Sequence, residues 1–118
     1  MARYHAGRLA LERGVPEEAR DRIALVVSEL CTNALRYAHA LGWPEPRCAL
    51  TVGVNRWLTE VWDPFPWQDL RAAVAHDKAG DEEESGRGLA LVAHLTDNAW
   101  GVRPSTRGGK VVWAVVRW

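Results

Sequence analysis

Glu29 and Asn33 are the first residues whose types and spacing could do chemistry. They are four positions apart, so on a helix they project from the same side, one turn from each other. A carboxylate can accept a proton, and an amide oxygen can bind a hard cation such as Mg²⁺. The alternative is a Glu–Asn pair on a solvated helix face, which for an isolated pair is the commoner case. The pair by itself leaves both interpretations open.

Asp63 is a second candidate, because it stands at the end of an apolar run and directly before Pro64. Asp and Pro both favour turns, so a turn is one interpretation. The other is a buried acceptor for the exocyclic amine of a ligand.

The segment Gly86-Arg87-Gly88 closes a polar stretch and precedes an apolar run that begins at Leu89. Glycine lets the backbone approach a ligand closely, and a helix N-terminus offers free N–H groups to phosphate. The acidic run Asp81–Glu84 would repel bare phosphate, so a phosphate site here would need a cation. A flexible loop entering a helix is the alternative, and one Gly-x-Gly does not decide between them.

Two helices precede these segments. The first is predicted from Ala2 to Arg13, ending at Gly14, since glycine accepts the left-handed backbone just past a helix end. The second is predicted from Pro16 to Leu41, with acidic residues in its first turn. It would position Glu29 and Asn33. Its apolar residues recur at steps of three and four, as in a helix that packs on a core: Ile23, Val26, Val27, Leu30, Ala34, Tyr37 and Leu41.

The remaining elements are mostly strands. Two hairpins are predicted, with strands at Arg47–Val54 and Trp57–Trp62, and at Ala99–Arg103 and Lys110–Trp118. Between them we expect helical residues at Gln68–His76, a polar loop at Asp77–Ser85 and a helix at Leu89–Leu95. Clustered strands with helices on one face predict an α+β two-layer sandwich, formed by residues 1–118 as a single domain.

Composition narrows the function. The 118 residues carry 15 basic and 15 acidic side chains, so no electrostatic footprint indicates binding to nucleic acid or to a membrane. Cys31 and Cys48 lack a metal-type spacing, and neither a signal peptide nor a membrane span is apparent. We therefore expect a cytoplasmic protein with reduced thiols. The seven tryptophans belong to the core or to a partner surface.

The order of the motifs resembles the GHKL ATPases, and within them the bacterial anti-sigma-factor serine/threonine kinases. The resemblance covers nearly the whole chain. It is carried by Ser28–Ala38, which resembles the N-box, by Val61–Pro64, by the glycine box Ser85–Val92, and by Trp100–Val102 and Gly109–Ala114 as closing strands.

This resemblance implies a Bergerat-type fold that binds ATP and Mg²⁺. Glu29 would be the general base and Asn33 the metal ligand, while Asp63 would accept a hydrogen bond from adenine. The remaining residues of the site would line the phosphates: Gly86, Arg87, Gly88 and Leu89. The implied partners are an anti-anti-sigma antagonist, phosphorylated on a serine, and a sequestered sigma factor.

Three departures from the family pattern stand out. Phe65 replaces the glycine of the wider superfamily, although the anti-sigma branch accepts the neighbouring prolines. Val111 stands where the branch usually has a threonine that helps to hold adenine, so weaker nucleotide binding is expected. The chain begins at a helix without the usual N-terminal strand, so the sheet would expose an edge, borrow a strand from a homodimer partner, or be missing residues.

Two alternatives therefore remain beside the kinase. One is a nucleotide-binding protein that sequesters its partner without phosphotransfer. The other is an interaction module that binds no nucleotide, since a fold does not fix a function.

Overall fold

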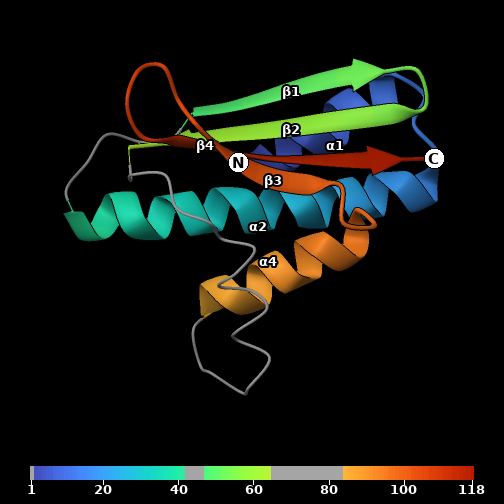
Figure 1. Ribbon diagram of the computed structural model, residues 1–118. Helices are drawn as coiled ribbons and strands as arrows, with labels where there is room; N and C mark the ends of the chain where they lie inside the picture. Colours follow the sequence, from blue (N-terminus) through green and yellow to red (C-terminus); the bar gives the residue numbers. More distant parts are fainter. Residues whose placement is uncertain (1, 42–46, 65–83) are drawn as a thin grey trace.

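A computed structural model describes residues 2–41, 47–64 and 84–118 of the chain. Within these residues, three helices lie to one side of a four-stranded antiparallel sheet (Figure 1). The elements follow in the order α1, α2, β1, β2, α4, β3 and β4. The predicted α+β two-layer arrangement is confirmed.

The two N-terminal helices have the predicted extents to within a residue. Helix α1 spans Ala2–Glu12, and Gly14 follows it with a φ of 70°. Helix α2 spans Glu17–Leu41, with Glu17 and Glu18 in its first turn, where carboxylates favour the positive end of the helix dipole. Its length lets one continuous helix cross the sheet and carry Glu29 at its middle and Asn33 one turn later.

Strands β1 (Arg47–Gly53) and β2 (Arg56–Asp63) form the first predicted hairpin, and β3 (Trp100–Pro104) and β4 (Lys110–Arg117) form the second. The order across the sheet is β1-β2-β4-β3, so the two hairpins join through β2 and β4. The first turn lies one residue earlier than predicted, at positions 54 and 55, and Asn55 adopts a φ of 54° there. Strands β2 and β4 are therefore central, and their ends meet where Asp63 pairs with Lys110.

The core lies between the two layers. Alternate residues of the central strands point into it, including Trp57, Val61, Val112 and Val116, each no more than 7% exposed. Helix α2 contributes Ile23, Val26, Val27, Leu30 and Ala34, most of the predicted stripe. Burial of this apolar surface is the main stabilising contribution and holds α2 over the sheet.

Helix α4 spans Glu84–Leu95 and begins five residues before the predicted start at Leu89, so this prediction was wrong. Two glycines weaken a helix by roughly 1 kcal/mol each. That cost does not stop the helix, because Leu89 and Val92 anchor it in the core. Phe65, the predicted helix Gln68–His76 and most of the loop Asp77–Ser85 lie outside the described residues. Among the described helices, none is both long and apolar enough to cross a membrane.

Candidate functional site

Glu29, Asn33 and Gly88 meet where α2 packs against α4. A Cβ atom added to Gly88 would lie 2.6 Å from Glu29 Oε2 and 3.8 Å from Asn33 Nδ2. Glu29 and Asn33 are both half-buried, whereas Gly88 is buried. The missing side chain of Gly88 thus leaves room for the two polar groups. The sequence predicted these three residues in one site, and the structure brings them together.

Asp63 is the last residue of β2, and it points to the helix side of the sheet. Its side chain is only 2% exposed, and Lys110 Nζ donates a hydrogen bond to Asp63 Oδ1 over 2.8 Å. Lys110 is itself only 4% exposed. Burying two charges costs several kcal/mol each, and their mutual attraction offsets this cost, so loss of one partner would destabilise the ends of both strands. A carboxylate has further acceptor positions, so the pair does not prevent Asp63 from contacting a ligand amine.

Sequence reasoning missed Lys110. The two-residue alternation along β4 could have identified it, because Lys110 lies on the same side of the strand as the buried residues Val112, Ala114 and Val116. A lysine at a core-facing position requires a partner, and Asp63 lies directly opposite in the ladder.

The alternation along β4 also corrects the expectation that Val111 lies beside the adenine and weakens its binding. Val111 pairs with Trp62, one position away from the Asp63–Lys110 pair, so its side chain points to the other face of the sheet. It therefore does not stand beside the predicted adenine site. Lys110 occupies the helix-facing position next to Asp63, and the weaker binding predicted from the loss of a hydroxyl at position 111 has no structural basis.

Gly109 fixes the turn that leads into β4. It has a φ of 75°, and a Cβ atom there would lie 2.2 Å from the carbonyl oxygen of Asp63. Only glycine fits this approach, since both the conformation and the space exclude a side chain. The β3–β4 turn is thereby held against the backbone at the end of β2.

The glycine-box residues lie in the first turns of α4. Gly86 and Arg87 belong to this helix, but their side-chain environment lies outside the described residues. Leu89 is 3% exposed and belongs to the hydrophobic core. The end of β2, the start of β4 and the second half of α2 lie at the same end of the molecule in Figure 1.

The donor set suits a magnesium nucleotide. Asn33 offers an amide oxygen and Glu29 a carboxylate, which are hard oxygen donors of the type that Mg²⁺ prefers. In the described part of the chain, no cluster of three or more His, Cys, Asp or Glu side chains forms a metal site built by protein alone. A cation here would accordingly bind through few protein ligands, as Mg²⁺ does when it accompanies phosphates.

Cys31 on α2 and Cys48 on β1 are free thiols that lie in contact. The hydrogen bond that Cys31 donates to Cys48, together with burial, raises the pKa of Cys31. The same hydrogen bond lowers the pKa of Cys48, against the opposing effect of burial. Cys48 is therefore the more reactive thiol of the pair.

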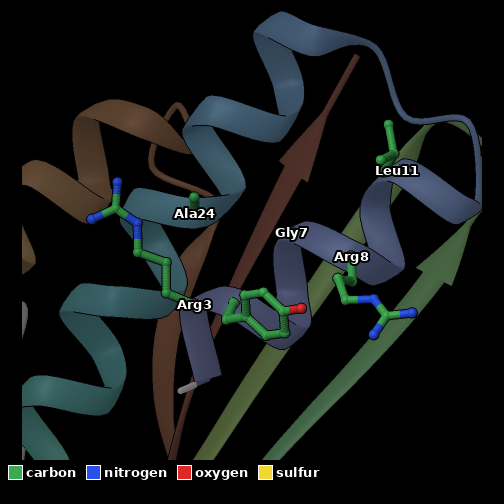
Figure 2. Close-up of a pocket in the computed structure, with 6 residues that line it drawn as sticks. Arg3, Gly7, Arg8, Leu11 and Ala24 are labelled. Carbon is green, nitrogen blue, oxygen red and sulfur yellow. The ribbon is translucent and has the colours of Figure 1, made fainter.

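A separate hollow of about 590 Å³ lies over α1 (Figure 2). It is lined by Arg3, Tyr4, Gly7, Arg8, Leu11 and Ala24. Tyr4 is 58% and Leu11 63% exposed, so the hollow is shallow and open. It contains none of the residues predicted for the site.

Comparisons with known proteins agree with this arrangement. The family model described as histidine kinase-like ATPase domain matches residues 2–116. A chain in the crystal structure of the SiaB–SiaC complex from Pseudomonas aeruginosa shares the fold with a TM-score of 0.71. The two are 14% identical, and the match covers 97% of this chain and 79% of that chain. No curated protein matches the sequence.

Proposed function

Because the chain belongs to the histidine kinase-like ATPase domain family, we propose that it binds Mg-ATP and regulates partner proteins by phosphorylating a serine. The observation that carries the proposal is the meeting of Glu29 and Asn33 at Gly88. In this proposal Glu29 is the proton acceptor and Asn33 the metal ligand, and both lie beside the first turns of the glycine-box helix. A solvated helix face would not need an enclosed glycine opposite the two polar side chains.

Each residue has a defined task in this proposal. Asp63 binds the adenine amine, and Lys110 holds the Asp63 carboxylate in place. Asn33 binds the Mg²⁺ ion, and the backbone of Gly86–Gly88 lines the phosphates. ATP with Mg²⁺ supplies the transferable γ-phosphoryl group and neutralises its charge.

Glu29 acts on the partner's serine. Its carboxylate accepts the hydroxyl proton while the serine oxygen bonds to the γ-phosphorus and the bond to the β,γ-bridging oxygen breaks. The products are phosphoserine and ADP, with the proton on Glu29. Glu29 lies one helical turn from Asn33, so the two side chains project from the same side of α2.

The proposed partners are an antagonist of the anti-anti-sigma type, which carries the serine, and a sigma factor that the domain sequesters. The motifs that resemble the anti-sigma kinases support this choice. The structural neighbour comes from a complex of two proteins, SiaB and SiaC, which is consistent with partner binding on this fold.

The Asp63–Lys110 ion pair favours a second candidate, a nucleotide-binding protein that sequesters a partner without phosphotransfer. Asp63 and Lys110 concern the adenine end of the nucleotide, so this pair supports nucleotide binding without requiring transfer of the γ-phosphoryl group.

A phosphotransfer assay with γ-labelled ATP and purified antagonists from the same genome separates the two candidates. The kinase proposal predicts label on a serine of one antagonist, and loss of that label when the serine is changed to alanine. ATP binding and a stable partner complex without label would instead establish the second candidate.

A further inference from the structure

Two cysteines from separate elements meet at the β1 edge of the sheet. Cys31 lies on α2, and Cys48 is the second residue of β1, which is an edge strand. Their thiols share a hydrogen bond, so the two sulfur atoms are neighbours in the folded protein. They are the only cysteines of the chain. Neither of them has a task in the proposed nucleotide site.

The register of the sheet directs Cys48 toward the helix layer. Cys48 pairs with Val61 of β2, and paired residues of neighbouring strands point to the same face of a sheet. Val61 is 1% exposed and lies in the core between the two layers. From the helix layer, Cys31 packs against the same core. Each thiol is therefore directed toward the other by the element that carries it.

The pair can be reached from solvent. Cys48 is exposed and Cys31 is half-buried. Fully buried cysteines behave as small apolar residues and are chemically inert, whereas an exposed thiol beside a second thiol can be oxidised. Cys48 thus offers a thiol that an oxidant can reach, and Cys31 offers a second thiol that can react with the oxidised sulfur.

We propose that Cys31 and Cys48 are a modification site, at which a peroxide converts the two thiols into a disulfide that joins α2 to β1. The Cys48 sulfur attacks one oxygen of hydrogen peroxide and the O–O bond breaks. Cys48 becomes a sulfenic acid, and its thiol proton leaves with the second oxygen as water. The Cys31 sulfur then attacks the Cys48 sulfur, so that the S–S bond forms while the S–O bond breaks. The hydroxyl group leaves as a second water with the proton of Cys31. The two thiols lose two electrons in total, and the peroxide gains them.

The disulfide should stabilise the fold. Sulfur atoms that already share a hydrogen bond need mainly side-chain rotation to reach the ~2.05 Å of a disulfide. Figure 1 places the start of β1 and the second half of α2 at the same end of the molecule. A bond between these elements restricts the unfolded chain more than the folded one. We therefore expect the oxidised protein to melt several degrees higher than the reduced protein.

The site is separate from the proposed nucleotide site. Cys31 is two residues from Glu29 and from Asn33, which on an α-helix is a rotation of about 200°. Glu29 and Asn33 lie beside Gly88 of α4, so Cys31 projects from the opposite side of α2. The disulfide therefore stands or fails independently of nucleotide binding.

Mass spectrometry of the reduced full chain, before and after a small excess of hydrogen peroxide, tests this site. We expect one product, lighter by two hydrogen atoms, in which the peptides that contain Cys31 and Cys48 stay joined until dithiothreitol is added. Its melting temperature should rise by several degrees and return on reduction. Cys48→Ser should show neither change, because it removes the exposed thiol and places a hydroxyl where solvent reaches it.

Cys31→Ala is the matched variant on the helix, where alanine is well tolerated. Peroxide should leave its Cys48 as a sulfenic acid, which dimedone traps, without a link inside the chain. Retention of both thiols in the folded parent would overturn the proposal, as would a disulfide that only joins two chains. A link that forms only after unfolding in urea would contradict it equally, because the folded structure would then not bring the sulfurs together.

Discussion

Glu29 separates catalysis from binding if it is the base. Glu29→Gln keeps a side chain of the same size in the space beside Gly88 but removes the proton acceptor. We expect Mg-ATP affinity close to that of the parent and a phosphotransfer rate lower by about 10²–10⁴-fold. Single-turnover transfer to the antagonist at saturating ATP measures this rate. Equal rates for the two proteins would remove Glu29 from the mechanism.

The Asp63–Lys110 pair can be tested by changing one partner and then both. Lys110→Met leaves the Asp63 carboxylate buried without the Lys110 ammonium and should cost about 3–5 kcal/mol of stability. Asp63→Asn combined with Lys110→Met removes both charges and should recover much of that loss. Urea unfolding of the three proteins gives the comparison. If Lys110→Met cost less than the double variant, the pair would contribute nothing as a unit.

Cys48 should react with iodoacetamide before Cys31 does. The hydrogen bond from Cys31 lowers the pKa of Cys48, so a larger share of Cys48 is thiolate at neutral pH than in an ordinary thiol. Mass spectrometry of briefly alkylated protein identifies the modified residue. Cys31→Ala removes the donor and should slow alkylation of Cys48, and an unchanged rate would show that the hydrogen bond does not control it.

Helix α4 provides a test of how one element positions a side chain on another. Gly88→Ala adds a methyl group 2.6 Å from Glu29 Oε2, so the flexible Glu29 side chain must move while the backbone stays. Stability should be equal to or above that of the parent, because alanine favours a helix by roughly 1 kcal/mol over glycine. Phosphotransfer should fall about 10²-fold, the typical cost of a 1 Å misplacement.

Gly7→Ala is the matched control for that substitution. It makes the same change in α1, where nothing lies within 4 Å of the added atom. It should raise the melting temperature slightly without affecting phosphotransfer. If Gly88→Ala behaved in the same way, the contact between α4 and Glu29 would have no functional role.

The elements themselves could be predicted to the extent that local chemistry determines them. Gly14 marks the end of α1, and the acidic residues Glu17 and Glu18 mark the start of α2, so both helices could be predicted closely. The start of α4 could not be predicted, because tertiary packing of Leu89 and Val92 outweighs the low helix propensity of two glycines.

The sequence also did not predict on which face of the sheet a given strand residue lies. The resemblance directed attention to Val111, but the ladder register places Lys110 beside Asp63 and Val111 on the other face. A shift of one residue in a strand reverses every side chain, so motif order without register cannot assign such a contact. Glu29, Asn33 and Gly88 could be grouped into one site because the ordered motifs resemble one family, whereas a four-residue helical step or one glycine by itself left the interpretation open.

The two faces of the sheet differ in the side chains that they carry. The helix side of the sheet holds the charged pair Asp63–Lys110 and faces the helices that carry Glu29 and Gly88. The opposite face carries the apolar residues Val111, Trp113 and Val115 of β4 together with the ion pair of Glu60 and Arg103.

Thermal melting of the full chain with and without Mg-ATP tests the central claim, nucleotide binding at this site, most directly. A ligand that binds only the folded protein at about 100 times its Kd adds ~2.7 kcal/mol of stability, which raises Tm by several degrees. We predict this rise for the parent with Mg-ATP, a smaller rise when Mg²⁺ is chelated, and little or none for a folded Asn33→Ala protein. An unchanged Tm for the parent at saturating Mg-ATP, or an equal rise in Asn33→Ala, would contradict the account.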